Sequence, residues 1–252
     1  MQRTQSLTLA EAIFPRIQND SGSLRLVLGW IRDATLMLGG AGIVTLFAQI
    51  VIRVPWTTVP ITGQTFAVLV AGSTLGAWRG AGSLSIYAIL GMIGVPVFAA
   101  GSGTTSGVWD VHFVLPWKGS EFLLWDASNG GYIVGFILAA ALVGFLAERR
   151  WDRGTWVHAG MLLGNVALYL PGLLWLGYLI STDWMPPGAS KPLSDLIAGS
   201  GTLDKTLKGG LYPFIAGDLM KLLLAAMILP GAWALVGKTG RLRPRLRNDR
   251  RV

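Results

Sequence analysis

The chain has 252 residues, of which 52% are apolar and only 13% charged, and its mean hydropathy is +0.54. Soluble domains carry about 25% charged residues, so this composition is that of a membrane protein. The apolar content excludes a disordered chain, and the absence of cysteine excludes a disulfide framework. At roughly 20 residues per span, the length suits one bundle of about six helices. The predicted fold class is therefore an all-α integral membrane protein with six transmembrane helices.

Six apolar runs approach the length of a bilayer span. They are Ala34–Ile52, Ile61–Trp78, Ala81–Ala99, Gly131–Ala147, Val157–Ile180 and Leu211–Gly237. Prolines lie inside or at the ends of these runs, at Pro96, Pro171, Pro213 and Pro230. Each proline frees a backbone carbonyl that only protein or trapped water can satisfy in lipid. Kinked helices around a cavity are therefore expected.

Basic residues predict the orientation of the bundle. When the connections alternate between the two sides, fifteen of the 21 Lys and Arg residues fall on the side of both termini. The positive-inside rule then puts both termini in the cytoplasm. We expect three parts: a cytoplasmic or interfacial segment (1–33), a transmembrane substrate-binding domain (34–237) and a basic cytoplasmic tail (238–252). The tail is expected to contact anionic lipid. The basic runs have no aromatic residues between them on which bases could stack, so no nucleic-acid partner is expected.

The N-terminal segment and two long connections carry further signals. Thr8-Leu-Ala-Glu11 fits a helix-capping box, and the apolar residues of 24–31 suggest an interfacial helix. The connections Gly101–Gly130 and Ser181–Gly210 would lie over the outer mouth of the bundle. The first is rich in aromatic residues, so it forms either a lid over a ligand or an anchor at the membrane interface.

The last apolar run contains an acid and a base, Asp218 and Lys221. A charge at mid-membrane costs about 2.5 to 3.5 kcal/mol, so such residues face the protein interior or an aqueous cavity. The i,i+3 spacing puts both side chains on one helix face. They either neutralise each other as a structural pair, or they recognise a ligand that has hydrogen-bond donors at one end and a carboxylate at the other.

Other intramembrane polar residues could converge on the same cavity or hold helices together by hydrogen bonds. They are Gln64, Tyr87, Asn165 and Tyr169. No metal site is expected, because the chain has no Cys, only two His and no HExxH motif. Gly237-Lys238-Thr239 resembles the end of a P-loop, but an apolar helix precedes it, so any ATPase must be another subunit.

Several segments resemble the BioY family in order and spacing. They are Val59-Pro-Ile-Thr-Gly-Gln64 to Gly72, Gly76-Ala-Trp-Arg79-Gly80, Ile86-Tyr87 to Phe98, Gly130-Gly-Tyr132 to Phe136, and Gly217-Asp218-Leu-Met-Lys221. The family comprises biotin-specific substrate-binding subunits, or S-components, of energy-coupling factor (ECF) transporters. The resemblance implies a six-helix S-component-like bundle in the plasma membrane of a prokaryote that captures biotin from the outer side. It implies no cofactor, with ATP used only by two ATPase partners that act through a transmembrane coupling subunit.

Biotin suits the chemistry of these residues. We expect Asp218 to accept from the ureido N–H groups and Lys221 to pair with the carboxylate, although the two roles could be exchanged. The resemblance also brings in further ligand contacts at Asn129, Asn165 and Tyr169, and packing by Tyr87, Phe98 and Tyr132. Ala41 and Thr45 are the best candidates for the surface that meets the coupling subunit.

Two other functions remain open at this point. One is an S-component for another small vitamin, because pocket chemistry can vary on one fold. The other is an intramembrane enzyme that uses Asp218 and Lys221 as acid and base, which lacks a third catalytic group. We expect no enzymatic activity.

Overall fold

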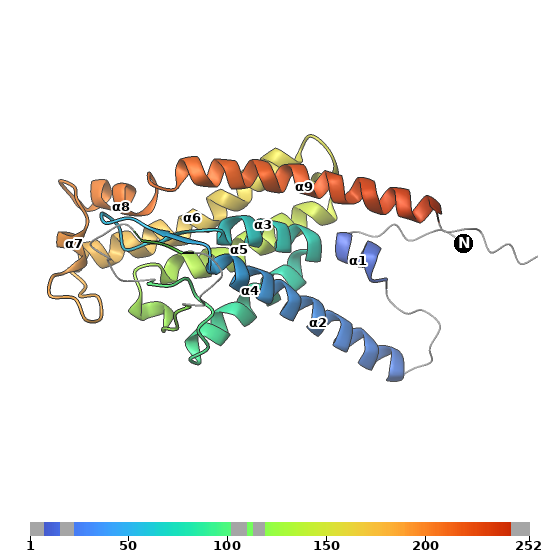
Figure 1. The fold of residues 1–252 in the computed structure, drawn as a ribbon, viewed down its shortest axis with the longest axis horizontal. Coiled ribbons are helices and arrows are strands. Elements are labelled where there is room, and N and C mark those ends of the chain that lie inside the picture. Colours follow the sequence, from blue (N-terminus) through green and yellow to red (C-terminus); the bar gives the residue numbers. More distant parts are fainter. Residues whose placement is uncertain (1–7, 16–22, 102–109, 113–118, 243–252) are drawn as a thin grey trace, which may run out of the picture.

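The computed structural model describes residues 8–15, 23–101, 110–112 and 119–242, and all six predicted apolar runs fall mainly in helices (Figure 1). These helices are α2 (Ser23–Ala48), α3 (Gln64–Leu75), α4 (Ala77–Met92), α5 (Gly130–Glu148), α6 (Val157–Ser181) and α9 (Ile215–Leu242). Shorter elements are α1 (Leu9–Ile13), α7 (Leu193–Leu196), α8 (Thr202–Gly210) and the 3₁₀ turns η1 (Leu124–Asp126) and η2 (Trp151–Arg153).

Four of these helices, α2, α5, α6 and α9, are long and apolar enough to cross a membrane by themselves. The other two are shorter than the sequence predicts. Gly76, at φ +88°, separates α3 from α4, so the 12 and 16 residues of these helices extend only about 18 and 24 Å. They form a helical hairpin within the bundle, and each is shorter than the roughly 30 Å of a bilayer core.

α5 and α6 form the most extensive helix pair of the bundle. Two glycines of α5 explain how closely the helices approach. A Cβ atom at Gly131 would lie 2.5 Å from the carbonyl oxygen of Pro171, and one at Gly135 would lie 2.2 Å from that of Leu168. Only glycine fits at these positions, as is typical of close helix packing in membranes.

The N-terminal segment packs against one end of the bundle. The side chain of Thr8 accepts a hydrogen bond from the N–H of Glu11, which confirms the predicted helix cap. Leu9 of α1 is buried in an apolar cluster that α3, α5, α6 and α9 also form, and α1 itself contacts α3 and α9. Arg79 of α4 is also buried there and forms ion pairs with Asp33 of α2 and Glu11 of α1.

The expected boundary between residues 33 and 34 lies inside α2, which is one continuous helix from Ser23. The predicted interfacial helix is therefore the first part of α2. Most of its apolar side chains are exposed: Leu24, Leu26, Val27, Trp30 and Ile31. Likewise, the expected tail from residue 238 begins inside α9, and residues 243–252 lie outside the described part of the chain.

A small antiparallel sheet, which the sequence did not predict, lies among the connections. Its strands are β1 (Val51–Arg53), β2 (Ile61–Thr62) and β3 (Asp110–His112), in the order β2-β1-β3. Residues 102–109 and 113–118 lie outside the described residues, so the structure tests only part of the aromatic connection. Within it, the ring of Phe122 packs against Phe98 at a centroid distance of 4.4 Å, whereas Trp125 is exposed.

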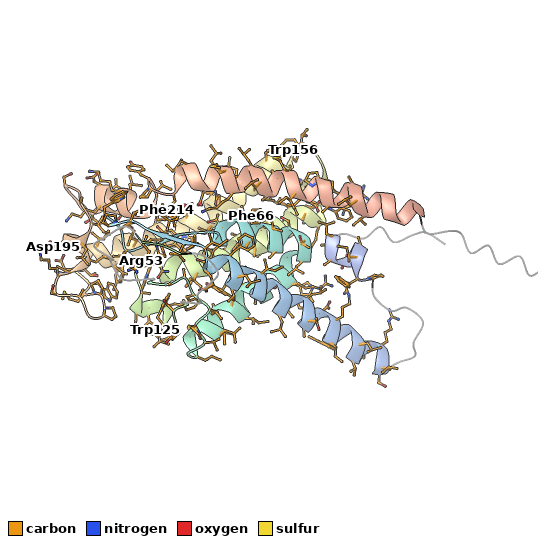
Figure 2. The ribbon with its side chains drawn as sticks, in the orientation of Figure 1. Arg53, Phe66, Trp125, Trp156, Asp195 and Phe214 are labelled. Carbon is orange, nitrogen blue, oxygen red and sulfur yellow. The ribbon has the colours of Figure 1, made fainter. Side chains whose placement is uncertain are left out.

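The two ends of the molecule differ. α1 and the end of α9 lie together at one end, and α7 and α8 lie at the other (Figure 1). Apolar side chains stand away from the bundle along α2 and α9 (Figure 2), and many large ones are exposed, such as Leu38, Leu174, Met220 and Met227. Such a surface suits lipid, so the chain is a multi-pass membrane protein.

Candidate functional site

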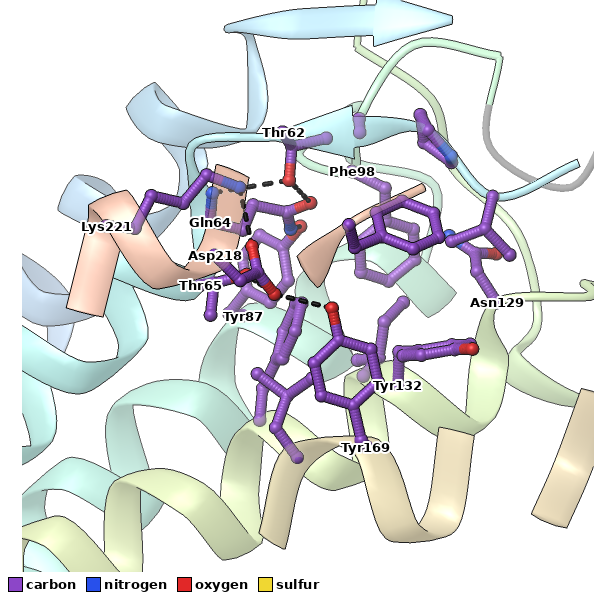
Figure 3. Close-up of a pocket in the computed structure, with 17 residues that line it drawn as sticks. Thr62, Gln64, Thr65, Tyr87, Phe98, Asn129, Tyr132, Tyr169, Asp218 and Lys221 are labelled. Carbon is purple, nitrogen blue, oxygen red and sulfur yellow. Dashed lines mark hydrogen bonds and ion pairs between the residues drawn. The ribbon is translucent and has the colours of Figure 1, made fainter. Parts of the chain in front are cut away.

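The predicted charged pair forms at the start of α9. Lys221 Nζ lies 2.8 Å from Asp218 Oδ1, and both residues face the interior of the bundle (Figure 3). Asp218 is 3% exposed and lies in the first turn of α9, where the free N–H groups of the helix favour a negative charge. Helix geometry alone therefore brings the two groups together.

Two hydroxyl groups from other helices reach the second carboxylate oxygen. Tyr169 of α6 donates to Asp218 Oδ2 at 2.5 Å, and Thr65 of α3 donates at 3.5 Å. With Lys221, the carboxylate therefore has three donors. The 3.5 Å contact is at the limit of hydrogen bonding and is the weakest of them.

A second polar group extends from the start of α3. Gln64 Nε2 donates to the hydroxyl of Tyr87 at 2.6 Å, and the hydroxyl of Thr62 donates to Gln64 Oε1 at 2.9 Å. Gln64 is the first residue of α3 and follows β2 after one residue, Gly63, so the strand helps to set where its amide group lies. Both polar atoms of this buried amide are satisfied within the protein.

Aromatic rings form the apolar walls. Phe98 meets Tyr87 edge to face at 5.3 Å, and Tyr132 meets Tyr169 at 5.9 Å with an interplanar angle of 87°. Edge-to-face pairs of this kind fix the orientation of both rings. The result is a cavity with aromatic, largely apolar sides and a few polar groups, which is the usual design of a small-molecule site.

The free cavity is small, about 40 Å³. It is lined by Val59, Pro60, Thr62, Gln64, Thr65, Tyr87, Phe98, Ala99, Asn129, Tyr132, Ile133, Phe136, Leu168, Tyr169, Phe214, Asp218 and Lys221. That volume has room for a few water molecules. A bicyclic ligand therefore requires some of these side chains to move apart.

Seven of the eight predicted site residues line this cavity, and Asn165 does not. Asn129 and Asn165 are both buried, at 8% and 9% exposure, and the Oδ1 atom of each has no hydrogen-bond partner among the described residues. A buried unpaired oxygen is costly unless a ligand or water supplies a donor. Asn129 is thus a free acceptor at the cavity wall.

Several residues that line the cavity were not among the predicted site residues. Thr62 and Thr65 lie within the motif around Gln64, so their place in that motif was the available signal. Phe214 precedes α9 and gave no signal of its own, since an aromatic residue beside an apolar run is ordinary in a membrane protein. Among the described residues, no cluster of His, Asp and Glu could hold a metal ion.

The two residues predicted to contact a partner are mostly buried within the chain. Ala41 is 2% exposed and Thr45 is 9% exposed, and the hydroxyl of Thr45 donates to the carbonyl of Ala41. They lie at the edge of a shallow groove that Gly39 and Gly42 also line, with open space above both glycines. A partner on this face would meet these glycines first, so the partner contact of Ala41 and Thr45 stays a prediction.

Comparisons with known proteins agree on one family. The model of the BioY family matches residues 16–112 and 118–238. The chain is 29% identical over 177 residues to "Biotin transporter BioY" of Thermotoga maritima, which covers 70% of this chain and 82% of the relative. It is 36% identical over 162 residues to "Probable biotin transporter BioY" of Methanothermobacter thermautotrophicus, covering 63% of this chain and 83% of the relative.

A solved structure shares the fold. It is the crystal structure of the S-component for biotin from an ECF-type ABC transporter, with a TM-score of 0.57, 19% identity, and coverage of 81% of this chain and 91% of that one. The matched segments include the residues that form the cavity, from Val59 to Lys221, apart from the short interruption at 113–117. The chain belongs to the BioY family.

Proposed function

We propose that this protein binds biotin and mediates its uptake as the substrate-binding subunit of an ECF-type ABC transporter. The observation that carries the proposal is the Asp218–Lys221 pair, which lines a cavity within a member of the BioY family. Relatives of this chain are named as biotin transporters, which supports transport rather than catalysis as the role.

The chemistry of biotin matches the cavity at both ends. Its ureido ring offers N–H donors and a carbonyl acceptor, and its side chain ends in a carboxylate. Asp218 would accept hydrogen bonds from the ureido N–H groups, which would replace the weak hydrogen bond that Thr65 donates to it. Lys221 would pair with the carboxylate of biotin. Asn129 offers one more acceptor, and Phe98 and Tyr132 pack against the bicycle.

The protein would lie in the plasma membrane of a prokaryote with six helices in the bilayer and both termini in the cytoplasm. A transmembrane coupling subunit and two ATPase subunits would supply the energy for transport. The chain itself would need no cofactor to capture the ligand. The excess of basic residues on the side of the termini supports this orientation.

Equilibrium binding of labelled biotin to the purified protein in nanodiscs tests the function. The expected result is saturable binding at one site per chain, lost or weakened at least about a hundredfold in Asp218→Asn, because a buried charged acceptor loses several kcal/mol of interaction. Asp195→Asn is the control, since Asp195 is an exposed acid of α7 and does not line the cavity. Its affinity should equal that of the unmodified protein.

A folded preparation that does not bind biotin would refute the proposal. Binding of another vitamin to the same preparation, lost in Asp218→Asn, would instead identify an S-component of different specificity. Turnover of any compound by the protein alone would favour an enzyme that uses Asp218 and Lys221.

A further inference from the structure

The joint between α8 and α9 leaves the carbonyls of two buried glycines without helical partners. Pro213 has no N–H, so it cannot form the i,i+4 hydrogen bond to the carbonyl of Gly209. The N–H of Phe214 bonds to the carbonyl of Leu211, which leaves the carbonyl of Gly210 open as well. Both glycines are buried, so each carbonyl needs a donor from elsewhere in the protein.

Two hydroxyl groups from distant parts of the chain supply these donors. The hydroxyl of Thr57 donates to the carbonyl of Gly209 at 2.5 Å, and the hydroxyl of Tyr132 donates to that of Gly210 at 2.8 Å. A Cβ atom at Gly210 would lie 2.4 Å from the Tyr132 oxygen, so only glycine permits this approach. The helix break is therefore held from two sides.

Thr57 joins two walls of the cavity without lining the cavity itself. It belongs to the connection between α2 and α3, which passes beside α8 (Figure 1), and it is 4% exposed. Its hydroxyl also accepts from the N–H of Val59 at 3.1 Å. Val59 lines the cavity on one side of this link, and Phe214 and Asp218 line it on the other side.

We propose that Thr57 is a positioning residue that fastens the α2–α3 connection to the α8–α9 joint and so keeps the ligand cavity closed. A ligand larger than the cavity of about 40 Å³ enters and leaves only when these walls separate. The link between Thr57 and Gly209 spans 152 positions of sequence and bridges those walls. It therefore slows both the entry and the release of ligand. This inference rests on the proposed biotin site, because that site supplies the ligand whose release is measured.

The test compares variants that differ by one hydroxyl group. Thr57→Val removes the hydroxyl at nearly constant volume, and Thr57→Ser keeps it. Thr58→Val is the matched control, since Thr58 is 1% exposed and its hydroxyl has no hydrogen-bond partner among the described residues. The readouts are the association and dissociation rates of labelled biotin in nanodiscs, and hydrogen exchange of residues 199–214 without ligand.

In Thr57→Val, the association and dissociation rates should both rise roughly threefold to tenfold, as loss of one buried hydrogen bond predicts, because the walls separate before entry as well as before release. Exchange in 199–214 should also rise, whereas Thr57→Ser and Thr58→Val should match the unmodified protein. Equal behaviour of Thr57→Val and Thr58→Val in both readouts would overturn the proposal. If no variant binds biotin, the proposed function fails, and hydrogen exchange alone still decides whether Thr57 holds the joint.

Discussion

Lys221 is the only ionised donor within hydrogen-bonding distance of Asp218 among the described residues, and its side chain is more exposed than that of Asp218, at 17% against 5%. An ammonium group has three N–H donors, so Lys221 can hold Asp218 and a ligand carboxylate together. We expect Lys221→Met to weaken binding of biotin at least about tenfold and binding of biotin amide much less, because only the free acid carries the charge. Competition against labelled biotin measures both affinities.

The control for Lys221→Met addresses folding. Removal of Lys221 leaves Asp218 as a buried unpaired charge, which costs about 3 to 5 kcal/mol in soluble proteins. The double variant Asp218→Asn with Lys221→Met has no such charge and should unfold near the temperature of the unmodified protein. Equal losses for biotin and its amide in Lys221→Met would show that Lys221 acts only by neutralising Asp218.

Asn129 and Asn165 form a natural pair for comparison, because both are buried with an unpaired Oδ1 atom and only Asn129 lines the cavity. We expect Asn129→Ala to weaken biotin binding roughly tenfold, through loss of an acceptor for the ligand, with little change in thermal stability. Asn165→Ala should leave binding unchanged. An equal loss of affinity in Asn165→Ala would show that Asn165 also reaches the ligand, as the family resemblance implied.

The helices hold each other through polar contacts at the end of the bundle where α1 and the last part of α9 lie (Figure 1). There, the buried carboxylate of Asp152 in η2 accepts from Nε1 of Trp233 in α9, and Arg153 packs on the Trp233 ring at 3.4 Å from its centroid. Burial raises the pKa of Asp152, and the contacts with Trp233 and Arg153 offset part of that shift. This carboxylate anchors the far part of α9 to the connection between α5 and α6.

The raised pKa predicts a pH dependence with a definite sign. The folded protein binds the proton of Asp152 more tightly than the unfolded chain does, so this group adds stability as the pH falls through the raised pKa toward the ordinary value near 4. Asp152→Asn stays neutral throughout. The unfolding temperature of the variant minus that of the unmodified protein should therefore be higher at pH 7 than at pH 4.5, measured by tryptophan fluorescence in detergent. A difference that falls as the pH rises would show that the ionised form is stabilised.

Hydropathy predicted where each long helix lies but not the residues at which each helix ends. The signal is local, so it located all six apolar runs, and it located Asp218 and Lys221 because ionised residues are rare in such runs. It placed the break between α3 and α4 at residues 79–80 and not at Gly76, and it missed the three short strands, because these features depend on backbone conformation and on pairing across the chain. The roles of Thr57 and Thr65 depend on contacts more than 150 positions away, which no local pattern contains.

The whole molecule has one end with both described terminal helices and another with α7, α8 and the start of α9, where the cavity lies (Figure 1). Capture from outside the cell requires that second end to face outward. The chain has no cysteine, so single cysteines can test this orientation without background. Ser190, between α6 and α7, and Thr155, between η2 and α6, are both exposed.

We expect a membrane-impermeant maleimide to label Ser190→Cys in intact cells, and to label Thr155→Cys only after the membrane is permeabilised. The basis is the surplus of Arg near Thr155, at Arg149, Arg150 and Arg153, which the positive-inside rule retains in the cytoplasm. Labelling of Thr155→Cys alone in intact cells would reverse the topology. The cavity would then open toward the cytoplasm, and this chain could not capture biotin from outside in the conformation described.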